Sequence, residues 1–447
     1  MIGALATDLY ELNMAASYLR RGMTRVATFS LFVRRLPPTR GFLVAAGLEP
    51  ALGFLESFRF EPGELEYLRD ELAFSDADVE ALGDLRFTGD VWAVPEGRVV
   101  YAGEPLLEVT APLPEGQLVE TLLLNQLTFH TSVASKAARC VLAAAGRDVV
   151  DFSFRRTQGT DAADAVARDS AIAGFTATSN VAAARRHGLR AAGTMAHSYI
   201  EAVPSEADAF RAFAADFPHR TTFLVDTYDT PGGVRTAIDV IQELELEPPL
   251  GIRLDSGDLL ALSSQAREML DEAGLQHVRI FVSGGLDDLD IDDLVRAGAP
   301  IDAFGVGTRM GVSADAPYLD TAYKLAEYDG RPVMKLSPDK ISVPGAKQVY
   351  RTGGGDVVTI RDEPPPDGGE PLLVKVMKDG KRTLPGPTPG EAVVAARRRL
   401  EADLASVPES ARDLRRPQAP APRMSPRLEA LAAEARTAVL SGDRSEP

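Results

Sequence analysis

The fold is decided by three short stretches in the middle of the chain: LGIRLDSGD (Leu250–Asp258), VRIFVSGG (Val278–Gly285) and AFGVGT (Ala303–Thr308). Each begins with a run of apolar residues and ends in glycine or polar residues. Runs that are apolar on both faces and separated by helix-length spacers are typical of parallel strands buried by crossover helices. The sequence therefore predicts repeated strand–helix units in this part of the chain.

The same pattern extends toward the N-terminus. Four earlier runs share it: DVVDFSF (148–154), FTATSN (175–180), LRAAGT (189–194) and TTFLVD (221–226). Together these runs predict an irregular, TIM-like α/β barrel over residues 131–330. Nearly every polar or charged residue of interest directly follows a run, and α/β barrels carry their active sites at the carboxyl ends of the strands. We therefore expect the functional site at that edge.

The segment before the barrel predicts part of a second, α+β domain. Within residues 1–130, the apolar pattern predicts a helix from Asp8 to Arg20, a strand in VATFSLFVRRLP (26–37) and a helix in the segment 44–56. Short β-rich runs broken by proline and glycine follow.

The segment after the barrel, residues 331–447, is expected to return to this second domain and to end as a helical, proline-rich tail. PLLVKVMKDGKRTLPGP (371–387) reads as a hairpin. RRPQAPAPR (415–423) is expected to be an extended linker, and SGDRSEP (441–447) a frayed end.

Composition excludes several classes of function. The 447 residues carry a net charge of −17, which disfavours binding to nucleic acid or to an anionic membrane surface. No apolar run reaches the ~18 residues of a membrane span, and acidic residues come too early for a signal peptide. The single cysteine, Cys140, is expected to be a small buried hydrophobe in a reducing compartment. We therefore expect a cytosolic protein that holds small anionic ligands with a few arginines and backbone amides.

Two neighbouring glycine turns predict a phosphate site. The first is formed by Ser283, Gly284 and Gly285, with a helix start behind it. Glycines at strand-to-helix turns are common, so one turn alone is a weak indication. The arrangement is repeated one unit later, at the usual phosphate position of α/β barrels; this second turn contains Gly305, Gly307 and Thr308.

Three arginines are candidates for holding an anion. Arg253 lies inside an apolar strand, where a guanidinium is costly unless a carboxylate or phosphate meets it, and Asp255 is the nearest carboxylate in sequence. Arg155 and Arg156 follow the run 148–154. A pair of arginines is usually a solvated surface feature, but here at least one is expected to face the ligand.

Further acids have both a functional and a structural interpretation. Asp226 and Asp229 suit Mg²⁺ shared with ligand phosphates, or turn chemistry alone. Asp258 is expected to cap a helix. Asp292 and Asp293 are expected on a solvated helix face.

GTMAHSYI (Gly193–Ile200) contains one of only five histidines, His197. An isolated histidine is more often structural than catalytic. Its place after a strand, near Arg253 and the glycine turns, favours a functional role here.

Taken in order, the motifs resemble those of the nicotinate phosphoribosyltransferase family over about residues 5–352. The blocks that carry the resemblance include TDLYELNMA, GFLVAAGLE, ETLLLNQLTFHTSVASKAAR, DFSFRRTQG, GTMAHSYI, LVDTYDT, IRLDSGD, VSGGLD and KLSPDKISVPGAKQVYR. The resemblance implies a type II phosphoribosyltransferase, an irregular α/β barrel whose second domain is built from the N-terminal and C-terminal segments. It also implies a homodimer with shared active sites.

The resemblance further implies a reaction and roles for single residues. Nicotinate and phosphoribosyl pyrophosphate would give nicotinate mononucleotide and pyrophosphate, with ATP and Mg²⁺ as cofactors and His197 as a phosphohistidine. His197, Arg253 and Asp255 are the expected catalytic residues, with Tyr10 reaching in from the partner subunit. The residues expected to bind substrates are Tyr10, Arg155, Arg156, Thr194, Ser198, Asp226, Ser283, Gly284, Gly285, Gly305, Gly307 and Thr308.

Alternative functions differ at a few positions. The related nicotinamide enzyme is expected to have an acid after the GT turn, where this chain has Met195. Quinolinate phosphoribosyltransferase would need more basic residues for two carboxylates. A phosphate-binding barrel that hydrolyses or isomerises sugar phosphates is a further alternative, which product analysis would distinguish. A binding protein without activity would have no need of a phosphorylatable histidine.

Overall fold

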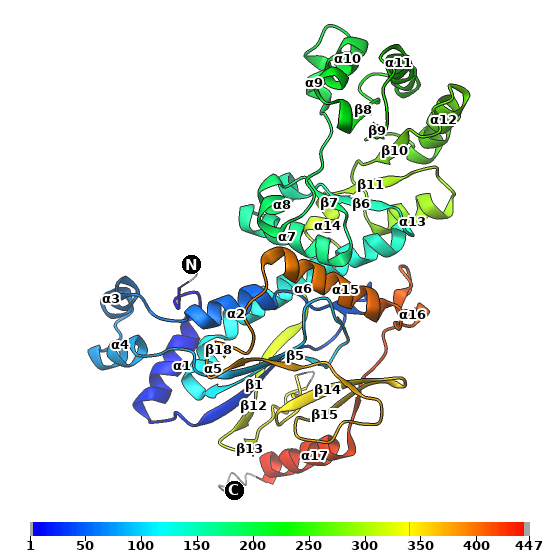
Figure 1. Ribbon diagram of the computed structural model, residues 1–447. Coiled ribbons are helices and arrows are strands. Elements are labelled where there is room, and N and C mark those ends of the chain that lie inside the picture. The colour runs from blue at the N-terminus through cyan, green and yellow to red at the C-terminus, as the bar shows by residue number, and fades with distance from the viewer. Residues whose placement is uncertain (1–2, 339, 442–447) are drawn as a thin grey trace. The chain divides into compact units, whose positions relative to one another are not determined.

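The computed structural model describes residues 3–338 and 340–441, which form two compact units (Figure 1). Unit 1 comprises the chain up to Ser132, Tyr318–Thr388 and the chain from Arg398. Unit 2 comprises Val133–Pro317 and Pro389–Arg397. Helices α6 (Glu120–Ala144) and α15 (Pro389–Leu404) each contribute residues to both units.

Unit 2 is built on a six-stranded parallel sheet in the order β7-β6-β11-β10-β9-β8. The strands are β6 (Asp148–Asp151), β7 (Ala177–Thr178), β8 (Thr221–Leu224), β9 (Leu250–Leu254), β10 (Arg279–Val282) and β11 (Ala303–Val306). Every residue of β9 and β11 is buried, as expected for strands covered on both faces. Among the described strands, β7 and β8 are the open edges, so the sheet is an irregular, incomplete barrel, and the predicted fold class is confirmed.

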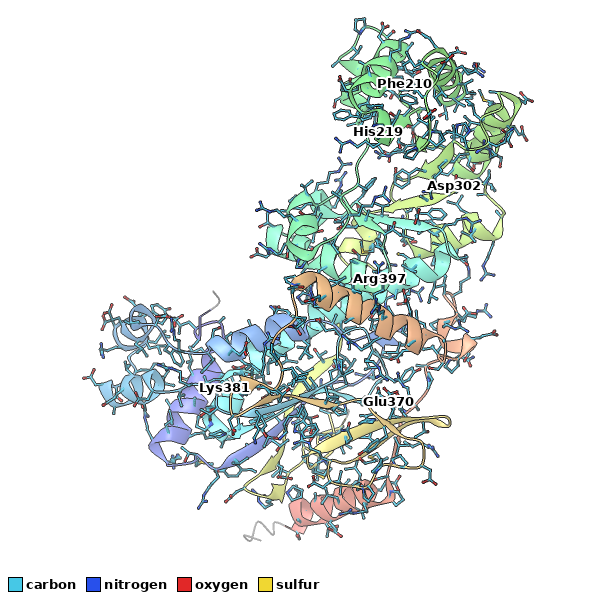
Figure 2. All side chains as sticks on the ribbon, viewed as in Figure 1. Phe210, His219, Asp302, Glu370, Lys381 and Arg397 are labelled. Carbon is cyan, nitrogen blue, oxygen red and sulfur yellow. The ribbon has the colours of Figure 1, made fainter. Side chains whose placement is uncertain are left out.

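Helices connect and cover these strands. They are α7 (Thr160–Ala173), α8 (Val181–His187), α9 (His197–Glu201), α10 (Glu206–Asp216), α11 (Thr230–Glu243), α12 (Leu259–Glu272), α13 (Asp288–Arg296) and α14 (Thr308–Gly311), with 3-10 turns at Phe154–Arg156 and Pro218–Arg220. Phe210 of α10, labelled in Figure 2, stacks on Phe223 of β8. The ring centroids are 4.6 Å apart. Arg397 of α15 donates to the carbonyl oxygens of Ala171 and Phe175 at the end of α7 (Figure 2). These contacts hold the helices around the sheet.

The strand expected at 189–194 is wrong. In this stretch only Ala191 forms an isolated parallel bridge, to Thr178 of β7. Ala191 and Gly193 are exposed. Apart from Leu189 its apolar side chains are alanines, which bury little area, so the stretch gains little from joining the sheet.

Unit 1 joins the two ends of the chain in one sheet. Its seven strands run in the order β13-β12-β1-β5-β3-β17-β18, and a smaller four-stranded sheet runs β16-β14-β15-β19. Strand β12, which the predicted barrel segment 131–330 includes, pairs here with β1. The strands are β1 (Val26–Val33), β2 (Leu43–Val44), β3 (Asp90–Ala93), β4 (Val99–Val100), β5 (Pro105–Pro112), β12 (Thr321–Tyr328), β13 (Arg331–Pro332), β14 (Lys347–Thr352), β15 (Gly355–Ile360), β16 (Glu370–Pro371), β17 (Val374–Lys378), β18 (Lys381–Arg382) and β19 (Arg423–Met424).

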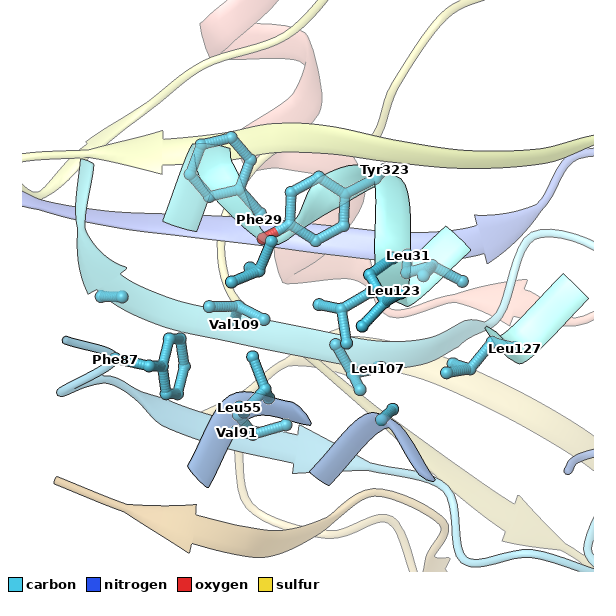
Figure 3. Packing of buried hydrophobic residues seen from close by; sticks show 14 of the residues in the cluster. Phe29, Leu31, Leu55, Phe87, Val91, Leu107, Val109, Leu123, Leu127 and Tyr323 are labelled. Carbon is cyan, nitrogen blue, oxygen red and sulfur yellow. The ribbon is translucent and has the colours of Figure 1, made fainter. Parts of the chain in front are cut away.

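The core of unit 1 lies between its large sheet and helices (Figure 3). Alternate residues of β1, including Phe29 and Leu31, point into it. Phe29 stacks on Tyr323 of β12 at 4.9 Å between centroids, and the Tyr323 hydroxyl donates to the Gly116 carbonyl (2.7 Å). The helices are α1 (Leu9–Arg20), α2 (Leu48–Ser57), α3 (Pro62–Asp70), α4 (Asp76–Gly83), α5 (Leu113–Leu118), α16 (Glu409–Arg412) and α17 (Pro426–Ser441).

Several smaller predictions can be compared with the structure. Strands β17 and β18 form the expected hairpin, and Cys140 is fully buried. Residues 415–422 are in neither helix nor strand, as expected for a linker. Ser441 ends α17, and the rest of the expected frayed end, 442–447, lies outside the described residues. No helix in the described part of the chain is long and apolar enough to cross a bilayer.

Candidate active site

The two ends of the parallel sheet in unit 2 differ in chemistry. At the amino end, Arg279 pairs with Asp148 (2.7 Å), and Asp302 accepts a hydrogen bond from the Ile280 amide (2.7 Å). These charges are satisfied by each other and by backbone. At the carboxyl end, the loops after the strands bring together most of the residues expected from the sequence, as the parallel register requires.

Arg253 of β9 is held on several sides. Its Nε donates to Ser283 Oγ (2.8 Å) and its Nη2 to Asp255 Oδ1 (2.6 Å). Nη1 makes longer contacts, to Thr194 Oγ1 (3.1 Å) and to the Met195 carbonyl (3.5 Å). The side chain is buried in the strand because a carboxylate pairs with it, as expected. Since Nη1 makes the longest contacts, it is the edge of the guanidinium that an incoming carboxylate can take most easily.

Asp255 connects Arg253 to the candidate histidine. Its Oδ1 accepts from Arg253 and from the Ser283 hydroxyl. Partial burial acts to raise the pKa of Asp255, but the Ser283 hydrogen bond and the Arg253 charge outweigh it and hold the pKa below its usual value. The carboxylate is therefore ionised at neutral pH, and its Oδ2 lies 3.9 Å from His197 Nε2.

His197 begins α9 with its imidazole between two partners. Its Nδ1 lies 3.2 Å from the Thr227 hydroxyl, and its Nε2 faces Asp255. The side chain is 40% exposed, so a substrate can reach the ring. The Ser198 side chain is exposed and makes no hydrogen bond to another described residue.

The segment 191–197 crosses the carboxyl end of the sheet. It starts at the open edge β7, where Ala192 donates to the Thr178 carbonyl (2.9 Å). Thr194 then reaches Arg253 of β9, and His197 reaches Thr227 after β8, the opposite open edge. One short segment therefore carries both Thr194 and His197 across the open side of the barrel.

Two of the acidic residues near this site cap helices, and a third does not. Asp229 and Asp258 cap α11 and α12 through the amides of Gly232 (2.8 Å) and Ala261 (3.1 Å). The expected cap at Asp258 is confirmed, and Asp229 has the structural role that was its alternative. Asp226 differs, because its Oδ2 accepts two hydrogen bonds while its Oδ1 is buried with no partner among the described residues.

A magnesium site can be tested against these acids. No group of three or more His, Cys, Asp or Glu side chains that could hold a metal occurs in the described residues. Mg²⁺, however, usually takes only one or two carboxylates, together with waters and substrate phosphates. Asp226 fits this pattern, since its Oδ2 is held by the Asp255 amide (2.9 Å) and its Oδ1 has no partner among the described residues.

The first glycine turn lies against the backbone of Asp255. Gly284 and Gly285 have φ of +106° and +74°, a region that favours glycine. A Cβ at Gly284 would lie 2.0 Å from the Asp255 carbonyl oxygen, whereas a Cβ at Gly285 would meet nothing within 4 Å. Neither amide donates a hydrogen bond to another described residue, so both can serve an anion.

The second glycine turn lies against Phe152. A Cβ at Gly305 would come within 2.9 Å of the Phe152 and Phe281 rings, and one at Gly307 within 2.8 Å of the Phe152 carbonyl oxygen. These glycines therefore have a packing reason of their own. Thr308 follows them, exposed at the start of α14.

The remaining predicted residues are exposed. Arg155 and Arg156 form a 3-10 turn after β6, beside the strand that leads to Thr308, and make no ion pair with another described residue. Tyr10 lies on α1 of unit 1, 48% exposed, and its role at a shared site stays a prediction.

Two site residues were missed in the sequence. Phe152 lies under Arg253, with its ring centroid 5.4 Å from the guanidinium carbon, and Thr227 binds His197. Phe152 lies near the end of the predicted run 148–154, and Thr227 directly follows the run 221–226, so their position was a usable signal. One expectation is wrong: Asp292 is buried and pairs with Arg296 (2.8 Å), because the face of α13 that it shares with Asp288 turns inward.

The chain was compared with known proteins. Two family models match it, the nicotinate phosphoribosyltransferase N-terminal domain over residues 5–128 and the nicotinate phosphoribosyltransferase family over residues 148–348. A nicotinate phosphoribosyltransferase of Mycobacterium tuberculosis (pncB2) is 50% identical over 387 residues, 85% of this chain and 83% of that protein. The Bacillus subtilis nicotinate phosphoribosyltransferase is 42% identical over 380 residues, 80% of this chain and 76% of that protein.

A solved structure agrees. The crystal structure of human nicotinic acid phosphoribosyltransferase superimposes with a TM-score of 0.82 and is 28% identical in sequence. The match includes 96% of this chain and 99% of the human chain. The agreement extends over both units and favours none of the alternative functions. The chain belongs to the nicotinate phosphoribosyltransferase family and is an enzyme of NAD salvage.

Proposed function

We propose that this enzyme couples ATP hydrolysis to the formation of nicotinate mononucleotide through phosphorylation of His197. The observation that carries the proposal is the placement of the imidazole, with Thr227 at Nδ1 and an ionised Asp255 at Nε2. The ring is partly exposed at the edge where α/β barrels bind their substrates.

The neighbours of the ring select Nδ1 as the nucleophile. A carboxylate only accepts hydrogen bonds, whereas a hydroxyl accepts or donates. We therefore assign the ring proton to Nε2, facing Asp255, which leaves the lone pair on Nδ1, where Thr227 donates to it. Attack of Nδ1 on the γ-phosphorus of ATP forms the N–P bond and breaks the P–O bond to ADP. The ring then carries positive charge, which Asp255 stabilises.

Nucleotide formation needs orientation more than proton transfer. The pyridine nitrogen of nicotinate attacks the ribosyl carbon, the bond from that carbon to pyrophosphate breaks, and the electron pair leaves with pyrophosphate. Arg253 Nη1 and the Thr194 hydroxyl would hold the nicotinate carboxylate beside the Phe152 ring. Positioning of this kind lowers the barrier because the reactants no longer have to find the right geometry.

The phosphates would be held by groups that have no partner among the described residues. Within the described chain, the amides of Gly284 and Gly285 donate no hydrogen bond, and Arg155 and Arg156 make no ion pair. Mg²⁺, held by Asp226 with the phosphates, would supply charge neutralisation for the leaving pyrophosphate. Thr308, Ser198 and the second glycine turn are further candidates for substrate contacts.

We also propose that two copies of the chain share their active sites. Tyr10 is about half exposed on α1, and partial burial, together with the charges of Glu120 and Glu11, raises the pKa of its hydroxyl. The phenol therefore stays protonated and can donate to a bound ligand of the partner subunit.

Phosphorylation of His197 can be tested with two histidine variants. His197→Ala is expected to lose labelling by γ-³²P-ATP and all stimulation of nucleotide formation by ATP, while slow transfer without ATP remains. The matched control is His219→Ala, an exposed histidine in the Pro218–Arg220 turn of the same unit (Figure 2), which should behave like wild type. Undiminished labelling or ATP stimulation in His197→Ala would refute the proposal.

A further inference from the structure

Thr227 lies on a turn that is fixed on both sides. The turn connects β8 to α11. Before it, Asp226 accepts from the Asp255 amide (2.9 Å), and after it, Asp229 caps α11 through the Gly232 amide (2.8 Å). These backbone-directed bonds set the path of the turn. The position of the Thr227 side chain is therefore defined by the folded chain and not by a free loop.

The Thr227 hydroxyl has one hydrogen-bond partner in the described chain, His197 Nδ1 at 3.2 Å. On the other side of the ring, Asp255 Oδ2 lies 3.9 Å from Nε2. The two contacts come from loops after different strands, β8 and β9. Together they fix both the rotation of the imidazole and the nitrogen that carries its proton.

We propose that Thr227 is a positioning residue for phosphoryl transfer to His197, an inference that rests on the proposed function. Before transfer, its hydroxyl donates to the Nδ1 lone pair and keeps that nitrogen unprotonated. When the γ-phosphoryl group arrives, the N–P bond replaces this hydrogen bond, and the same hydroxyl donates to a phosphoryl oxygen. Thr227 thus acts on the nucleophile first and on the phosphohistidine afterwards, without making a covalent bond itself.

The test compares Thr227→Val, which keeps the branched shape but lacks the hydroxyl, with Thr227→Ser, which restores it. The matched control is Thr230→Val, because Thr230 begins α11 in the same loop and its hydroxyl makes no hydrogen bond to another described residue. Thermal unfolding identifies any variant that is misfolded. Nicotinate mononucleotide formation, with and without ATP, should be unchanged in Thr230→Val.

Two readouts separate positioning from a structural role. The first is the tautomer of His197, read by ¹⁵N NMR without ATP: wild type should show a proton on Nε2, and Thr227→Val a mixture with Nδ1. The second is the phosphoenzyme formed from γ-³²P-ATP, which should form about tenfold more slowly in Thr227→Val, the effect of one lost hydrogen bond, and decay faster. Thr227→Ser should recover both.

The outcomes distinguish this inference from the proposed function. If wild type is phosphorylated on His197 and Thr227→Val matches it in both tautomer and phosphoenzyme, the role of Thr227 is refuted and the phosphohistidine stands. If wild type forms no phosphoenzyme while its tautomer still depends on Thr227, the proposed ATP coupling is wrong, and the phosphoryl step assigned to Thr227 is overturned with it.

Discussion

The tightest geometric constraint in the site is at Gly284, and it yields a prediction of defined size. In Gly284→Ala the new Cβ would lie 2.0 Å from the Asp255 carbonyl oxygen, whereas ordinary contacts begin at 3.4 Å. The two backbones must separate by roughly 1.4 Å, and a misplacement of about 1 Å can cost about 10²-fold in rate. Because Asp255 contacts Arg253 and faces His197, we expect kcat/KM to fall about 10²-fold, equivalent to about 2.7 kcal/mol of transition-state stabilisation.

Gly285→Ala is the matched control for this substitution. Gly285 also has positive φ, but an added Cβ there meets nothing within 4 Å. Both variants share the strain of a left-handed alanine, about 1 kcal/mol, and both keep their amides. The comparison of kcat/KM and of the melting temperature between the two variants therefore separates the effect of the clash, present only in Gly284→Ala, from that of the backbone strain, present in both. Equal kcat/KM values for the two variants would show that the turn does not position Asp255.

Two further predictions concern the ion pair beside the histidine. Arg253→Ala should raise the KM for nicotinate much more than the KM for phosphoribosyl pyrophosphate, since Nη1 is the edge available to the carboxylate; equal increases would mean that the arginine is misplaced in the mechanism. The pKa of Asp255 is held below its usual value, so the stabilisation from its ionised form is complete above the unfolded-state pKa and is lost as pH falls through the folded pKa. Asp255 should therefore stay ionised in the folded and unfolded states between about pH 6 and 8. Over this range the melting temperatures of wild type and Asp255→Asn should change with pH in the same way.

The sequence predicted the sheet of unit 2 because its strands are apolar on both faces, a pattern that crossover helices require. It also predicted that Arg253 needs a carboxylate or a phosphate as its partner, because a guanidinium in an apolar strand is costly without one. The order of the strands was not accessible in this way. An apolar run predicts that a strand is buried, but it does not identify the neighbouring strand. The open edges β7 and β8 are therefore known only from the structure.

Errors arose where a local pattern was compatible with two environments. Residues 189–194 contain short apolar side chains, which suit either a strand or an exposed crossing segment, and the exposed Ala191 and Gly193 decided for the latter. The pair Asp292 and Asp293 suggested a solvated face, but successive helix positions point in different directions, and only Asp293 is exposed. Thr227 was overlooked because a threonine in a turn is unremarkable until its partner is known.

The open side of the barrel offers a physical link between the two halves of the proposed reaction. Thr194 and His197 lie three residues apart on the segment 191–197, which crosses from β7 to β8, and each contacts a residue at the end of a different strand. Asp255 connects Arg253 with His197, because one of its oxygens binds the guanidinium while the other faces the imidazole. The positive charge of a phosphorylated His197 ring would be stabilised by Asp255, the same carboxylate that neutralises Arg253. Phosphorylation would therefore leave the guanidinium less neutralised and more attractive to the nicotinate carboxylate, which couples ATP to substrate binding without a large movement of the chain.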